Sequence, residues 1–217
     1  NRPGIYNPYP LAGAPATDKW GGMMQYAAGL NVAATNTDAV TFWIKVNSID
    51  PLDVNTATLR LDLGQISEDI IPDKKLETED SNQNGRYDPG EDIGLDGLTD
   101  AQEQAKFLGA ADPNDPSNDD YKGYASDAAN DHLNGQEGNA SDAQSGLKPD
   151  AEDLNSNGAL DVDNAYYEYE IPLNMSKYVI GTSPAYNAYQ LRVPLAEFKH
   201  IVGTQDSSFS NINYYRL

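Results

Sequence analysis

The chain has 217 residues, a net charge of −20 and no cysteine. Its acidity argues against nucleic acid and anionic membrane surfaces as partners, because both are themselves negatively charged. The lack of cysteine excludes disulfides, thiolate metal sites and cysteine nucleophiles. With 39% hydrophobic residues the chain can still bury a core. It shows no initiator methionine, signal peptide or long apolar run, so we expect a piece of a longer protein.

The acidic residues are concentrated in the middle of the chain. Residues 73–163 hold 23 of the 34 acidic residues but only six of the 14 basic ones, and four of the 20 aromatic residues. We therefore predict that residues 1–72 and 164–217 form the two parts of one β-sandwich. Residues 73–163 form an acidic insertion, mostly of loops.

The first flank shows the alternation of half-buried strands. Residues 41–47 place Phe42, Ile44 and Val46 on one side of a strand, and residues 58–64 place three leucines on one side and Asp62 on the other. Antiparallel sheets with one wet face produce this pattern. It predicts strands that must pair with later strands across the insertion.

A calcium-type loop follows at the start of the insertion. The motif D-x-[DN]-x-[DN]-G-x5-E is met by Asp80, Asn82, Asn84, Gly85, Arg86, Asp88 and Glu91, at positions 1, 3, 5, 6, 7, 9 and 12. Side chains at positions 1, 3, 5 and 9 converge with the carbonyl of position 7, and the carboxylate of position 12 closes the cage. An all-oxygen donor set of this size suits Ca²⁺ better than Mg²⁺ or zinc.

One short helix is predicted within the insertion. Thr99 and Gln102 form a capping box, and Gly109 suits the position just past the helix end. Residues 110–149 are rich in Asp, Asn, Ser, Gly and Ala, which predicts a long loop.

A second calcium-type loop ends the insertion. Its ligand positions are held by Asp153, Asn155, Asn157, Ala159 and Asp161. Position 12 is Asn164, so the closing carboxylate is missing or displaced. Asn at positions 3 and 5 lowers the charge of both sites, which predicts modest affinities, on the order of 10⁻⁵ to 10⁻³ M.

Two alternatives stay open for these loops. Loops rich in Asx and Gly also form ordinary turns that bind nothing. If they bind Ca²⁺, the ion either staples the acidic insertion into shape or mediates binding of a further ligand. They are not EF-hands, because Pro89, Gly90 and Gly94 break the helix that would follow the first loop.

The second flank again alternates. Residues 166–173 place Tyr167, Tyr169 and Ile171 on one side, and residues 188–195 and 211–217 continue the pattern. Together the flanks predict an all-β, jelly-roll-like β-sandwich.

Catalytic motifs are not evident. The two histidines, His132 and His200, have no sequence neighbours at zinc-ligand spacing, and no hydrolase, P-loop or zincin motif occurs. Trp20 and Trp43 suit either a sugar platform or a packed core. We therefore expect no enzyme.

Four segments of the chain resemble one known protein family. They are "GGMMQYAAGLNVAATNTDAVTFWIKV", "LRLDLGQISEDIIPDKKLETED", "GEDIGLDGLTDAQE" and "DLNSNGALDVDNAYYEYEIPL". In this order they resemble the SprA/Sov family, the outer-membrane translocons of the type IX secretion system in Bacteroidetes, which are linked to gliding motility. The resemblance covers residues 20–217.

The resemblance implies a domain of the cell envelope, associated with the outer membrane on its extracellular or periplasmic face. Its partners would be other domains or subunits of the translocon, and this piece would not itself insert into the membrane. We expect a non-enzymatic structural or interaction domain stabilised by Ca²⁺. The alternative is a calcium-dependent carbohydrate-binding module of a bacterial cell-surface protein, with a glycan as partner.

Overall fold

The structure is a computed structural model that describes residues 22–30, 32, 36–45, 57–91, 93–106, 114–117, 149–173, 177–204 and 208–217. The chain divides into two compact units. One comprises residues 1–26 and 67–163 and contains the acidic insertion. The other comprises residues 27–66 and 164–217 and contains most of the β-structure.

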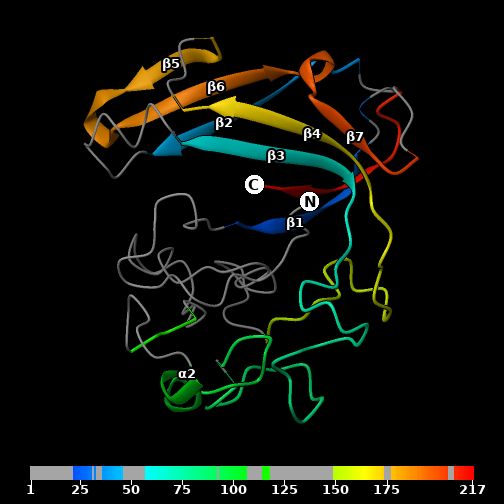
Figure 1. Cartoon of the computed structure of the whole chain (residues 1–217), viewed down its shortest axis with the longest axis vertical. Helices are drawn as coiled ribbons and strands as arrows, with labels where there is room; N and C mark the ends of the chain where they lie inside the picture. The colour runs from blue at the N-terminus through cyan, green and yellow to red at the C-terminus, as the bar shows by residue number, and fades with distance from the viewer. Residues whose placement is uncertain are drawn as a thin grey trace. The chain divides into compact units, whose positions relative to one another are not determined.

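The β-structure consists of two antiparallel sheets (Figure 1). The five-stranded sheet has the order β1 (Met24–Leu30), β8 (Ile212–Arg216), β3 (Thr58–Gln65), β4 (Ala165–Pro172) and β7 (His200–Val202). The three-stranded sheet has the order β2 (Ala39–Lys45), β6 (Ala188–Pro194) and β5 (Val179–Ser183). The only α-helix in the described residues is α2 (Asp100–Lys106), beside two 3₁₀ turns, η3 (Pro184–Tyr186) and η4 (Leu195–Glu197). The predicted all-β fold with one short helix is confirmed.

The two sheets share one apolar core. On β4, Tyr167, Tyr169 and Ile171 are at most 1% exposed, as their alternation predicts. They form one cluster with Leu191 and Val193 of β6, in the other sheet. The hydroxyl of Tyr169 donates to the carbonyl of Leu195 at 2.8 Å, so the polar end of this buried ring is satisfied. Period-2 sequence patterning therefore fixes which face of each sheet is buried.

The strands β3 and β4 meet across the insertion. Leu61 pairs with Tyr169 and Leu63 with Tyr167 in antiparallel register, although about a hundred residues separate the two strands in the chain. The pairing that the sequence analysis required is therefore present.

One strand residue departs from the prediction. Asp62 was placed on the wet face of its strand, yet it is only 1% exposed. Its Oδ2 accepts from Arg216 Nη2 at 2.6 Å and from Arg216 Nε at 2.9 Å, whereas its Oδ1 has no partner. The guanidinium also lies over the Tyr166 ring, 5.2 Å from its centroid. Burial raises the pKa of Asp62, and Arg216 opposes that rise.

The described residues of the unit that contains the acidic insertion bury few apolar side chains. The described apolar cluster of this unit consists of Ile70, Leu95 and Ile71. Among the described residues of this unit, the buried polar side chains other than Ser117 are acidic: Glu68, Glu79, Glu91, Glu103, Asp115, Asp150 and Glu152. Buried carboxylates require partners, so the hydrogen bonds of this region decide its shape.

The short helix begins as its capping box predicts. Thr99 N–H and the Thr99 hydroxyl both donate to Gln102 Oε1 at 2.9 Å. Gly109, the predicted end signal, lies outside the described residues. Among the described residues, no helix is long and apolar enough to cross a membrane.

Candidate metal centre: two oxygen-rich loops

The first loop is wound around the carboxylate of Asp80. Asp80 Oδ1 accepts from Asn84 N–H at 2.9 Å and Oδ2 from Gly85 N–H at 2.7 Å. Gly85 has φ +70°, a left-handed conformation that glycine adopts without strain. The motif glycine thus turns the chain back over the first acidic residue.

The carboxylate of Asp88 gathers the two asparagine side chains of the first loop. Asp88 Oδ2 accepts from Asn82 Nδ2 at 2.8 Å and from Asn84 Nδ2 at 2.7 Å. These two bonds lower the pKa of Asp88 below its usual value. Positions 3, 5 and 9 are therefore brought together.

The carboxylate of Glu91, at position 12, bonds to both ends of the first loop. Glu91 is 4% exposed. Its Oε1 accepts from Ser81 N–H at 3.2 Å and its Oε2 from Asp88 N–H at 2.9 Å. Asn82 Nδ2 also donates to Glu91 Oε1, at 3.3 Å. The structure thus joins Asp80, Asn82, Asn84, Asp88 and Glu91 in one hydrogen-bonded loop.

The second loop repeats this arrangement. Asp153 Oδ1 accepts from Asn157 N–H at 3.0 Å and Oδ2 from Gly158 N–H at 2.7 Å, and Gly158 has φ +80°. Asp161 Oδ2 accepts from Asn155 Nδ2 at 2.7 Å and from Asn157 Nδ2 at 3.2 Å. The predicted side chains of the second loop therefore also lie together.

Position 7 contributes through its backbone. Arg86 N–H donates to Asn84 Oδ1 and Ala159 N–H to Asn157 Oδ1, each at 2.7 Å. These bonds tie positions 5 and 7 in both loops. That the two carbonyls act as ligands stays a prediction.

Glu68 is the residue of this site that the sequence analysis missed. It is fully buried. Its Oε1 accepts from Leu154 N–H at 3.0 Å and its Oε2 from Asp161 N–H at 3.0 Å. In addition, Glu68 N–H donates to the Asp161 carbonyl at 2.7 Å. A carboxylate from just before the insertion is thus held against the loop that lacks its own carboxylate at position 12.

The donor set of both loops fits a hard cation. Every side-chain group at positions 1 and 9 is a carboxylate, and positions 3 and 5 offer amide oxygens. Oxygen-only sets of this kind suit Ca²⁺, whereas zinc prefers nitrogen and sulfur. Amide protons of two asparagines lie against each position-9 carboxylate, where positive charge is favourable.

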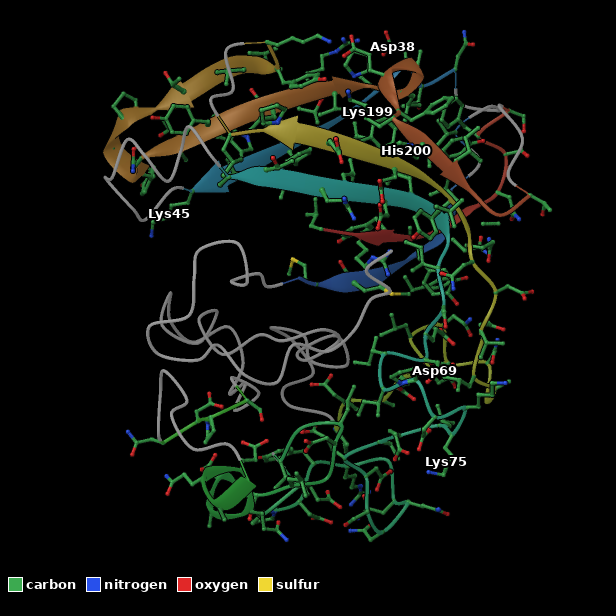
Figure 2. The ribbon with its side chains drawn as sticks, in the orientation of Figure 1. Asp38, Lys45, Asp69, Lys75, Lys199 and His200 are labelled. Carbon is green, nitrogen blue, oxygen red and sulfur yellow. The ribbon has the colours of Figure 1, made fainter. Side chains whose placement is uncertain are left out.

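A second group of potential ligands lies on the five-stranded sheet. Glu168 and Glu170 of β4 and His200 of β7 place ligand atoms within 4.8 Å of one another. Their proximity follows from strand pairing, because Glu168 is directly opposite His200; Figure 2 shows His200 on β7. Arg60 Nη1 lies 3.3 Å from Glu168 and Arg60 Nη2 lies 3.5 Å from Glu170. Both carboxylates thus already have a cationic partner.

The described residues give little support for a glycan-binding surface built from Trp20 and Trp43. Trp43 is 53% exposed on β2. Trp20, which would have to lie beside it, is outside the described residues. An exposed single tryptophan does not by itself define a glycan site.

Fold and loops together define a class: a β-sandwich domain interrupted by an acidic insertion with paired oxygen-rich loops. The family model SprA_N, described as motility related/secretion protein, matches residues 103–217, more than half of the chain. The chain belongs to this family. A comparison with curated proteins finds no match. Family membership confirms the resemblance seen in the sequence and indicates a role in motility or secretion at the cell envelope.

Proposed function

We propose that this domain is a non-enzymatic structural and interaction module of a type IX secretion translocon at the outer membrane. The observation that carries the proposal is the family match over residues 103–217. The match takes in residues 103–163 of the insertion and the strands from β4 to β8, so part of each unit lies in the matched region. The domain's partners are then other domains or subunits of the translocon.

We further propose that Ca²⁺ bound in the two loops stabilises the insertion. Support comes from the motif spacing and from the shared hydrogen bonds of the two loops: Asn84 donates to both Asp80 and Asp88, and Asn157 donates to both Asp153 and Asp161. The insertion carries most of the chain's negative charge, and the described residues of its unit form only a small apolar cluster. A bound cation offsets this repulsion and stabilises the folded state by mass action.

Thermal unfolding in calcium and in EGTA tests the stapling role. For dissociation constants on the order of 10⁻⁴ M, 10 mM Ca²⁺ should raise the melting temperature by about 5–10 °C. Mg²⁺ at the same concentration should give a much smaller rise, because it demands a tighter octahedral site. Equal melting in calcium and EGTA would leave the loops as ordinary acidic turns.

Matched variants assign the effect to the loops. Asp80→Ala and Asp153→Ala should each remove part of the calcium-dependent rise, whatever they do to stability in EGTA. Glu77→Ala removes one charge from the same region without touching a motif position, so it should keep the full rise. A rise that survives in the double variant Asp80→Ala/Asp153→Ala would place calcium elsewhere.

Translocon membership needs a test in cells. Cross-linking of the full-length parent protein should recover this domain with other envelope proteins in the outer-membrane fraction. Recovery of the parent only in the cytoplasmic fraction would contradict the proposal. The glycan-binding alternative is not adopted, because its one supporting feature in the described part of the chain is the exposed Trp43.

A further inference from the structure

The tripeptide Glu-Asp-Ile occurs twice in the unit that contains the insertion, at residues 68–70, just before the insertion, and at residues 91–93, within it. Both glutamates act on a D-x-N-x-N-G loop in the same manner. Glu91 accepts from the amides at loop positions 2 and 9, Ser81 and Asp88, at 3.2 and 2.9 Å. Glu68 accepts from the amides at the same two positions of the other loop, Leu154 and Asp161, both at 3.0 Å. The two glutamates are therefore equivalent in sequence context and in contacts.

A second pair of glutamates extends the equivalence. Glu79 directly precedes the first loop and Glu152 directly precedes the second. Glu79 Oε1 accepts from the amides of residues 93 and 94 at 3.3 and 3.1 Å, which follow Glu91 by two and three positions. Glu152 Oε1 accepts from the amides of residues 70 and 71 at 3.0 and 3.1 Å, which follow Glu68 by two and three positions. Each loop therefore bonds to one Glu-Asp-Ile segment in two ways. The glutamate of the segment accepts from loop amides, and the glutamate before the loop accepts from amides of the segment and the residue after it.

The two halves meet at an antiparallel bridge between Thr78 and Ala151. Each of these residues lies two positions before the first aspartate of its loop. The bonds on either side are reciprocal: Glu79 N–H donates to the carbonyl of residue 150, and Glu152 N–H donates to the carbonyl of residue 77, both at 3.0 Å.

The carboxylates repeat the same exchange. Glu79 Oε2 accepts from the amide of residue 150 at 2.8 Å, and Glu152 Oε2 accepts from the amide of residue 77 at 3.1 Å. Equivalent residues that exchange equivalent bonds across one bridge are the signature of a local two-fold axis.

We propose that the insertion, together with the residues just before it, contains an internal duplication with one copy split in the chain. The contiguous copy is residues 79–94, with its loop first and its Glu-Asp-Ile segment second. The split copy joins residues 68–71 to residues 152–161, in the opposite order along the chain. In this copy Glu68 has the role of Glu91 and closes the second loop, which therefore forms only when the two distant segments dock.

Amide hydrogen exchange in calcium-free buffer tests this equivalence directly. Glu68→Gln should speed exchange at Leu154 and Asp161 by about ten-fold, because each amide loses a charged acceptor. Glu91→Gln should do the same at Ser81 and Asp88. The matched control Glu77→Gln removes one charge from the same region, and exchange at all four amides should stay unchanged.

Exchange at the β4 amides separates local from global effects. If Glu68→Gln also speeds exchange at Tyr167 and Tyr169, the variant has lost structure beyond the second loop. The variant Glu68→Asp is then measured in its place. That variant keeps the charge but shortens the side chain, and should speed exchange at Leu154 and Asp161 alone. Wild-type exchange at these two amides in both variants would overturn the proposal.

A calcium titration of the same variants extends the test to the metal, and this extension rests on the proposed function. Glu68→Gln should weaken calcium binding to one of two sites by ten-fold or more, as Glu91→Gln does to the other. Exchange effects without any calcium binding would sink the metal proposal and leave the duplication intact. Calcium binding that depends on Glu91 but not on Glu68, with wild-type exchange at Leu154, would sink the duplication alone.

Discussion

The two units of this chain are each stabilised by a different kind of interaction. The sandwich buries large apolar side chains such as Tyr167, Ile171 and Leu191, none of them measurably exposed. The insertion buries glutamates, and their carboxylates accept backbone amides from segments far apart in the chain. The first arrangement gains stability from removing apolar surface from water. In the second arrangement, carboxylates lose their water and gain hydrogen bonds to backbone amides. Its stability therefore depends on each of these bonds and on bound cations.

A segment poor in apolar residues can still fold to one arrangement of its loops. Hydrogen bonds are directional, so Glu68, Glu79 and Glu152 select which loops meet and in which register. The free-energy cost of removing a carboxylate from water offsets most of what its hydrogen bonds contribute, unless a cation is also bound. The insertion is therefore expected to be well specified and weakly stable.

The largest effect is expected from truncation in the sandwich core. Tyr167→Ala removes a fully buried ring that packs on Phe209 at 4.3 Å between centroids, and should cost about 3–5 kcal/mol in the free energy of unfolding. The control Tyr186→Ala removes a ring that is 71% exposed and should cost less than about 0.5 kcal/mol. Urea unfolding followed by circular dichroism measures both. Similar costs for the two variants would contradict the assigned core.

A buried ion pair should give the next largest effect. Arg216→Met leaves the carboxylate of Asp62 buried without its partner, and should cost about 3 kcal/mol at neutral pH. The control Arg192→Met breaks a pair whose acid, Asp38, is 83% exposed, and should cost under about 1 kcal/mol.

The pH dependence of the Arg216→Met variant has a definite sign. Burial already raises the pKa of Asp62, and loss of the arginine raises it further. A raised carboxyl pKa favours the folded state below that pKa and disfavours it above. The cost of the variant should therefore shrink as pH falls toward the range where Asp62 takes up a proton. A cost that grows on acidification would contradict this assignment.

A single carboxylate in the insertion should have a moderate effect. Glu152→Gln replaces one acceptor oxygen with an amide group and opposes the donor at residue 77, so it should cost the insertion about 1–3 kcal/mol. Limited proteolysis of residues 67–163 should accelerate while the sandwich strands stay protected. Unchanged proteolysis would show that these buried bonds do not hold the insertion.

The smallest effect is expected at the helix start. Gln102→Ala removes the side-chain oxygen that accepts from Thr99 N–H, and should cost about 1 kcal/mol or less. Exchange at the Thr99 amide should rise, and exchange in the sandwich should not. A change in β4 exchange would show that the short helix matters beyond its own turn.

Much of the sandwich could be predicted because its strands alternate strictly. Tyr167, Tyr169 and Ile171 were placed on one side of a strand from spacing alone, and that side is buried. The strands β1, β5 and β7 were not predicted, since they are rich in small residues or too short for a period-2 signal. Asp62 was misplaced because its partner Arg216 is more than 150 residues away in the chain.

The candidate site was predictable where it is contiguous. The first loop contains all its positions within twelve residues, so the motif names them. The second loop is completed by Glu68, 85 residues before Asp153, and a motif read along the chain cannot find it. The repeated Glu-Asp-Ile tripeptide was the available signal, and its meaning depends on which segments meet in space.

Calorimetric titration of the whole chain with Ca²⁺ tests the central claim most directly, because it counts the sites. The account predicts two sites per chain with dissociation constants on the order of 10⁻⁵ to 10⁻³ M, one lost in Asp80→Ala and the other in Asp153→Ala. A chain that takes up no Ca²⁺ at millimolar concentration, or that binds it equally well in both variants, would contradict the account.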